Sequence, residues 1–260
     1  MTPPANSIGG ARTDPRTPLS PHFPPDNTPP AEELRPRTDS AAAISVSIET
    51  LESYGAEKSM AYERTKRVLD VIVASAALLV LAPPMVVIAL WIKLTDYGPV
   101  LFRQVRVGRG GREFVCYKFR SMVMGADELK EQLQAQNHHQ NSFTFKMRRD
   151  PRVTRVGWLI RKTSMDELPQ LWNVIQGDMS IVGPRPPVPS EVAWYTPYHL
   201  RRLEVKPGLT CIWQVSGRGD IPFEQQMVHD LQYIENRSLW LDLSLIFKTI
   251  PAVVSGKGAY

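Results

Sequence analysis

The stretch at residues 68–92 reads VLDVIVASAALLVLAPPMVVIALWI and decides which kind of fold this chain can adopt. No formally charged side chain occurs in the 22 residues at 71–92. A straight helix of that length spans about 33 Å, which is enough to cross the hydrocarbon core of a bilayer. The sequence therefore predicts a helix embedded in a membrane.

Two prolines, Pro83 and Pro84, lie in the middle of this apolar run. A proline removes a helical hydrogen-bond donor and clashes with the preceding turn, so we expect a break or a sharp kink. Lys and Arg favour the cytoplasmic side of a membrane, and they flank the run on both sides: Arg64, Lys66 and Arg67 precede it, and Lys93, Arg103, Arg106 and Arg109 follow. The pattern favours a re-entrant membrane helix at 61–95. A single-span anchor and a buried core helix remain open alternatives.

The N-terminal region has a different composition. Ten of the 23 prolines of the chain lie in the first forty residues, where aliphatic side chains are few. Such a segment cannot bury enough apolar surface to offset its chain entropy. We expect residues 1–60 to form a disordered tail and linker, and the absence of a basic start followed by an apolar run argues against a signal peptide.

Charge is distributed unevenly along the chain. Residues 1–60 hold five Lys and Arg against eight Asp and Glu, whereas residues 61–260 hold 26 against 18. The basic part suits an anionic partner such as a nucleic acid, a membrane surface or a phosphorylated substrate. Two cysteines, Cys116 and Cys211, are too few for a disulfide scaffold or a four-cysteine zinc site.

The segment at 96–260 no longer shows the continuous apolar pattern of the membrane helix. Strand-like composition at 100–107 and 112–122 flanks a glycine-rich turn, which predicts a β-hairpin, with a phosphate-binding glycine loop as the alternative. Helices and turns then alternate from residue 154 onward. Residues 238–256 are apolar and aromatic, so they either lie in the headgroup plane or pack on the core. We expect a mixed α/β, mostly helical fold: a re-entrant membrane helix hairpin plus a small cytoplasmic catalytic domain with a short β-hairpin and interfacial amphipathic helices.

The stretch at 161–178, RKTSMDELPQLWNVIQGD, combines carboxylates with cations. Ser164 and Glu167 have the spacing of a capping box, which predicts a helix that begins near Met165 with Asp166 in its first turn. Adjacent carboxylates beside Arg161 offer oxygen ligands for Mg²⁺ or a nucleophile. The alternative is that Glu167 only caps the helix and Asp166 is a surface residue.

Three further cations are candidate ligands for phosphate or substrate. The Gly-Pro-Arg-Pro run restricts the backbone on both sides of Arg185 and so limits where its guanidinium can point. Lys118 lies in the aromatic segment YKFR, and Arg218 follows a glycine in KPGLTCIWQVSGR. The alternatives are an exposed turn, a water-facing strand position and a structural loop, respectively.

Taken in order, the segments KRVLDVIVASAALLVLAPP, YKFRSM, TSMDELPQLWNV, MSIVGPRP, KPGLTCIWQVSGR and DLQYIENRSLWLDLSLIFKTI closely resemble the bacterial sugar transferase family. Its members are monotopic polyprenyl-phosphate hexose-1-phosphate transferases, which begin exopolysaccharide and glycoconjugate assembly. The resemblance covers residues 61–260. The re-entrant helix of the family usually breaks at a Ser-Pro pair, which is Ala82-Pro83 here.

The resemblance implies a reaction and a site. Asp166 matches the nucleophile that attacks a UDP-sugar, expels UMP and carries the phosphosugar to undecaprenyl phosphate. Glu167 matches the second carboxylate, which helps to hold Mg²⁺. Three cations match residues near the phosphates: Lys118, Arg161 and Arg185. The implied location is the bacterial cytoplasmic (inner) membrane, with the catalytic domain on the cytoplasmic face, membrane lipids as partners and no nucleic acid.

Two other functions are compatible with the residues alone. A metal-dependent phosphohydrolase would use the same Asp-Glu pair and transfer to water. A membrane-tethered module that binds nucleic acid or a protein would use the basic surface, and its binding would be strongly salt-dependent. The resemblance favours the transferase.

Overall fold

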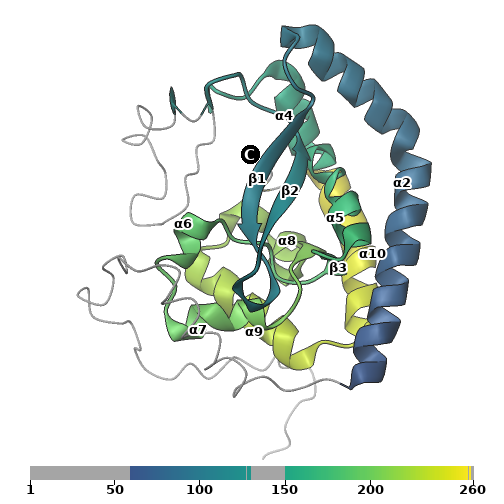
Figure 1. The fold of residues 1–260 in the computed structure, drawn as a ribbon, viewed down its shortest axis with the longest axis vertical. Helices are drawn as coiled ribbons and strands as arrows, with labels where there is room; N and C mark the ends of the chain where they lie inside the picture. The colour runs from purple at the N-terminus through teal and green to yellow at the C-terminus, as the bar shows by residue number, and fades with distance from the viewer. Residues whose placement is uncertain (1–58, 127, 130–149, 257, 259–260) are drawn as a thin grey trace, which may run out of the picture. The chain divides into compact units, whose positions relative to one another are not determined.

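A computed structural model describes residues 59–126, 128–129, 150–256 and 258. The predicted tail and linker lies outside the described residues except for its last two positions. The described chain begins with the long helix α2 (Met60–Asp96), which is followed by the strands β1 (Leu101–Val107) and β2 (Glu113–Phe119), as Figure 1 shows.

Short elements make up most of the rest. They are the 3₁₀ turn η2 (Arg109–Gly111), α4 (Arg155–Lys162), the 3₁₀ turn η4 (Met165–Glu167), α5 (Gln170–Gln176), β3 (Ser180–Val182), α6 (Pro189–Val192), α7 (Pro197–Leu200), the 3₁₀ turn η5 (Arg201–Glu204), β4 (Gly208–Thr210), α8 (Ile212–Ser216) and the 3₁₀ turn η6 (Arg218–Asp220). Two longer helices close the chain, α9 (Phe223–Asn236) and α10 (Leu239–Ser255).

The predicted mixed, mostly helical class is confirmed, and so is the hairpin. β1 and β2 pair antiparallel from Leu101 opposite Phe119 to Val107 opposite Glu113. The sequence did not predict the second pair, in which β3 runs parallel to β4. This pair depends on two glycines, because a Cβ on Gly208 would overlap the backbone of Gly183.

The apolar run forms one continuous helix, so the first of the two expectations at Pro83 and Pro84, a break, is wrong. Helix α2 changes direction in its second half (Figure 1), which agrees with the second expectation, a kink. A bend moves the proline rings away from the carbonyls of the preceding turn, and the rest of the helix keeps its hydrogen bonds. Among the described residues, this is the helix whose length and apolar character would allow it to cross a membrane.

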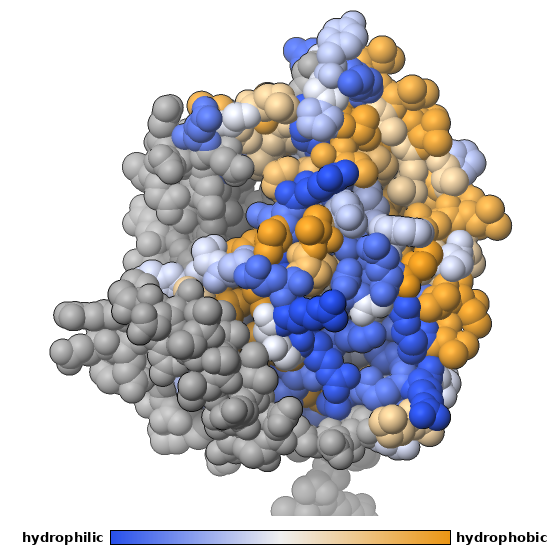
Figure 2. Space-filling view, viewed as in Figure 1, coloured by the Kyte–Doolittle hydropathy of each residue, from blue (hydrophilic) through white to orange (hydrophobic). Residues whose placement is uncertain are grey.

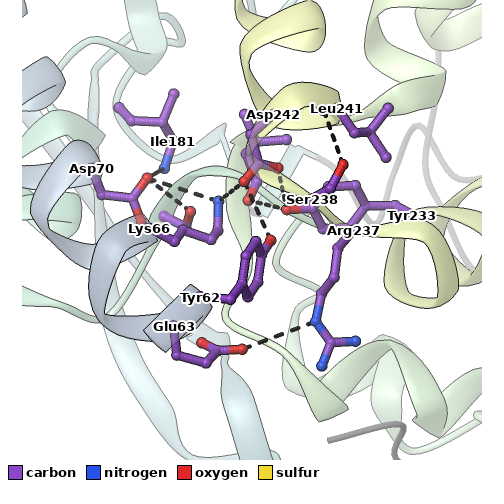
Figure 3. A network of polar contacts seen from close by, with 12 residues as sticks. Tyr62, Glu63, Lys66, Asp70, Ile181, Tyr233, Arg237, Ser238, Leu241 and Asp242 are labelled. Atoms are coloured by element: carbon purple, nitrogen blue, oxygen red, sulfur yellow. Dashed lines mark hydrogen bonds and ion pairs between the residues drawn. The ribbon is translucent and has the colours of Figure 1, made fainter. Parts of the chain in front are cut away.

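Polar contacts fix the N-terminal end of α2 to the rest of the protein (Figure 3). The ammonium of Lys66 lies 2.9 Å from Oδ2 of Asp242 on α10. Oδ1 of Asp70 accepts hydrogen bonds of 3.0 Å from the hydroxyl of Ser180 and the backbone N–H of Ile181. Because Asp70 is buried, these bonds satisfy a charge that would be costly without partners.

Helix α2 packs against the same body at both ends. Ala74 belongs to a core cluster with Leu171 and Val174 of α5. Farther along, Ile88 and Ile92 pack with a second cluster formed by Phe119, Val156 and Ile160. The opposite side of the helix is exposed and apolar, and Figure 2 shows this surface along the right edge of the view. One helix therefore provides both core contacts and a large apolar face.

We expect Gly157→Ala to destabilise the fold, because a Cβ at this position of α4 would overlap the backbone carbonyl of Ser121. Displacing backbone should cost at least about 2 kcal/mol, more than the roughly 1 kcal/mol that alanine gains in helix propensity. Thermal unfolding measures the effect. The exposed Arg155→Ala in the same helix is the control and should stay within about 0.5 kcal/mol. A Tm unchanged by Gly157→Ala would contradict this packing.

Candidate active site

The carboxylate pair lies in the 3₁₀ turn η4, between α4 and α5. Ser164 precedes this turn in the left-handed conformation, with φ 55° and ψ 17°, and its side chain makes no capping hydrogen bond. The predicted capping box is therefore wrong, because an N-cap residue needs an extended backbone for its side chain to reach the free amides. The next α-helix begins at Gln170, after Pro169.

Asp166 and Glu167 differ in their partners. Oε1 of Glu167 accepts a hydrogen bond of 2.7 Å from Nζ of Lys118, and Nη2 of Arg185 lies 2.9 Å from the same oxygen. Asp166 is 9% exposed. Burial and the neighbouring charge of Glu167 raise the pKa of Asp166 to about 6.

The charge on Glu167 is stabilised. Burial opposes ionisation, but Arg185 and Lys118 outweigh it and hold the pKa of Glu167 well below its usual range. Two adjacent carboxylates thus titrate far apart, a pattern typical of active sites in which each carboxylate has its own role.

Three elements from distant parts of the sequence supply this cluster. Lys118 comes from β2, and Arg185 follows β3. Asn173 on α5 holds β2 in place, since its Nδ2 donates to the carbonyl of Val115 at 2.7 Å and its Oδ1 accepts from the N–H of Tyr117 at 3.1 Å. Asn173 is fully buried, and sequence reasoning missed it. A polar residue between Leu171 and Val174 on the apolar face of a helix could have indicated a buried hydrogen-bonding role.

The two remaining cations of the predicted site act on the pair through their charge. Arg161, in the last turn of α4, lowers the pKa of Asp166. Arg218, in η6, lies near enough for both carboxylates to act on its pKa, which burial lowers. Its Nη1 is buried without a hydrogen-bond partner and its φ is 53°, so this arginine is held in an unusual backbone conformation beside the carboxylates. The structure thus brings together the predicted cations Lys118, Arg161, Arg185 and Arg218 around the dyad.

The comparison with known families decides the identity. A model of the family described as bacterial sugar transferase matches residues 61–256. The chain belongs to this family. The dyad and its cations lie within the matched region, which also contains α2 from its second residue onward and both strand pairs of this bacterial sugar transferase.

Curated relatives extend the comparison. The sugar transferase is 47% identical over 199 residues to an undecaprenyl-phosphate galactose phosphotransferase of Salmonella typhimurium. The aligned region covers 75% of this chain and 41% of the relative. The sugar transferase is 44% identical over 198 residues to the exopolysaccharide production protein ExoY of Rhizobium meliloti, over 75% of this chain and 88% of the relative. A UDP-glucose:undecaprenyl-phosphate glucose-1-phosphate transferase of Caulobacter vibrioides is 40% identical over 219 residues, covering 81% of this chain and 78% of the relative.

We expect Asp166→Asn to stabilise the sugar transferase at pH 8. The raised pKa of Asp166 means that the folded protein favours its neutral form, so stability falls as pH rises from about 4 to about 6 and then levels off. Asparagine avoids a cost on the order of 2–3 kcal/mol at pH 8 and gains nothing near pH 4. Thermal unfolding from pH 4 to 8 measures the difference. A Tm for Asp166→Asn below wild type at pH 8 would contradict the assigned environment.

Proposed function

We propose that this bacterial sugar transferase moves a hexose-1-phosphate from a UDP-sugar to undecaprenyl phosphate and releases UMP. The reaction would be the first membrane step of exopolysaccharide or glycoconjugate assembly. The relatives from Salmonella and Caulobacter support the substrate classes by their names. The observation that carries the proposal is the buried Asp166, with its raised pKa, beside a Glu167 whose charge two cations neutralise.

Asp166 is the proposed nucleophile. One of its carboxylate oxygens attacks the phosphorus next to the sugar and forms a new P–O bond. The bond from this phosphorus to the bridging oxygen breaks, and UMP leaves with the electron pair. A phosphate oxygen of undecaprenyl phosphate then attacks the same phosphorus and regenerates the carboxylate. The covalent intermediate allows one site to use a water-soluble donor and a lipid acceptor in turn.

The local charges favour Asp166 over Glu167 for this role. Oε1 of Glu167 is engaged by both Lys118 and Arg185, which lowers its basicity. Asp166 has the higher pKa and is therefore the better nucleophile once it is ionised. The surrounding cations neutralise charge on the phosphates, the main requirement of phosphoryl transfer.

Mg²⁺ is the proposed cofactor. Within the described ranges, His, Cys, Asp and Glu form no group of three or more that could hold a metal ion. Mg²⁺ keeps several waters and usually binds through one or two carboxylates together with substrate phosphates, so the pair Asp166 and Glu167 fits this ion. When bound, the ion would neutralise charge on the diphosphate.

The packing of α2 supports a re-entrant arrangement. Both ends of the helix contact the same body, which cannot lie on both sides of a bilayer at once. Helix α10 also carries an exposed apolar stripe at helical spacing, formed by Trp240, Leu243, Phe247, Ile250 and Val254. This stripe suits a helix that lies in the headgroup plane. The aromatic ring of Tyr195 is not available for such a contact, because it is buried in the core. We propose that the protein lies in the bacterial inner membrane with its catalytic part on the cytoplasmic face.

The nucleophile is tested with Asp166→Asn. We expect UMP release and lipid-linked product both to fall by at least about 10³-fold, because the amide cannot form the phosphorus bond. The assay uses undecaprenyl phosphate and a panel of UDP-sugars, and Asp178→Asn, beyond the end of α5, is the control with wild-type rates. Undiminished glycolipid from Asp166→Asn would refute the assignment. Sugar phosphate released into water without glycolipid would favour a phosphohydrolase.

Topology is tested with single cysteines at the exposed residues Ser59 and Thr95, which flank the apolar run. Both native cysteines are buried and should give little background. A membrane-impermeant maleimide should label neither position in cells whose outer membrane alone is permeabilised, and both positions once the inner membrane is opened. Labelling of one position before opening would show that the helix spans.

A further inference from the structure

The loop that carries Arg185 is held by its backbone carbonyls. Gly183 opens this loop, and three of the four residues after it are prolines, so few N–H groups are available to fix it. The carbonyls accept instead, and their donors are Tyr233 Oη to Val182 (3.0 Å), Gly208 N to Pro184 (2.8 Å), Arg202 Nη2 to Arg185 (3.0 Å), Arg106 Nη1 to Pro186 (2.8 Å) and Val107 N to Pro187 (2.9 Å).

Arg202 reaches the carbonyl of Arg185 from a fully enclosed position. It is 5% exposed, and its Nη2 also bonds Oδ2 of Asp230 at 2.6 Å, where Asp230 is 1% exposed. Its Nη1 donates to the hydroxyl of Tyr195 at 2.6 Å. These contacts come from α9 and from the segment after α6, so the guanidinium has little freedom to turn.

Arg106 approaches the same loop from β1. Its Nη1 donates to Pro186, and its Nη2 donates to Oε1 of Gln104 at 2.6 Å. Burial and the nearby positive charge of Arg185 lower the pKa of Arg106. The two like charges repel, so the guanidinium of Arg185 is favoured on the side of Glu167.

We propose that Arg106 and Arg202 are positioning residues that hold the backbone at Arg185 from both sides and thereby keep its guanidinium on Glu167. The role rests on the proposed function of the dyad. Neither residue would touch the substrate. Arginine suits the task because its planar group donates several hydrogen bonds in fixed directions, which lysine cannot reproduce.

Arg202→Lys tests the role with a change that keeps a cation beside Asp230. We expect kcat/KM at pH 7 to fall roughly tenfold to hundredfold, since a small displacement of a charged group that binds phosphate has effects of that size. We expect kcat to fall by about the same factor with KM little changed, because the guanidinium of Arg185 would stabilise the charge that develops on the phosphates during the transfer.

A double-mutant cycle separates positioning from a general structural role. In an Arg185→Gln background the guanidinium to be positioned is absent. Adding Arg202→Lys to this background should therefore lower kcat/KM by less than about threefold. Arg201→Lys is the matched control, since this neighbouring arginine pairs with Glu204 and Glu235 at the surface. Equal losses from Arg202→Lys in the wild-type and Arg185→Gln backgrounds would overturn the proposal.

A second measurement does not depend on transferase activity. ¹⁵N NMR of the guanidinium groups of arginine-labelled protein, with the Arg185 signals assigned by their loss in Arg185→Gln, reports how freely the Arg185 guanidinium turns. We expect slow rotation in the wild type, where Nη2 of Arg185 lies 2.9 Å from Oε1 of Glu167, and faster rotation in Arg202→Lys. If the wild type proves inactive, the proposed function fails while this rotation still tests the positioning. Arg106→Met acts on the loop from the other side and should have the same effect, so it provides the test should Arg202→Lys not fold. Unchanged rotation in a folded variant would refute the role.

Discussion

Oε1 of Glu167 contacts two cations from distant parts of the chain, and the arrangement of the candidate active site depends on this contact. It joins η4 to β2 through Lys118 and to the loop after β3 through Arg185. Loss of the carboxylate would leave two largely enclosed cations without their anion, which is costly in a protein interior. The same contact also affects the neighbouring residue: burial is the main reason why the pKa of Asp166 is raised, and the charge that Glu167 retains raises it further.

In the proposed membrane arrangement, helix α2 connects this site to the lipid. Two charged side chains near its N-terminal end bind the body directly, since Asp70 accepts from β3 and Arg67 donates to the last carbonyls of α5. Apolar contacts with α4 fix the other end. In that arrangement, a body attached at both ends of one helix would have a restricted height and tilt relative to the membrane. For the proposed transfer between a soluble nucleotide sugar and a lipid phosphate, this would hold the proposed nucleophile at the boundary where both substrates can reach it.

Much of the site could be predicted, and the failures have local physical causes. Motif order identified the dyad and its cations, and alternating composition identified the hairpin. The capping box at Ser164 failed because its left-handed backbone follows from how α4 ends, which residue spacing does not encode. The break at Pro83 failed because a helix supported by packing on both sides of the proline can bend instead. Asn173 and Arg202 escaped notice because their roles depend on partners far away in sequence.

The most direct measurement is intact-mass and peptide mass spectrometry of the wild-type protein incubated with a UDP-sugar and Mg²⁺ but without a lipid acceptor. We expect one added hexose phosphate on the peptide that contains Asp166, together with one equivalent of UMP, and we expect this group to be lost when undecaprenyl phosphate is added. The account would be contradicted if Asp166 carried no hexose phosphate before the acceptor was added and the same protein then still formed glycolipid.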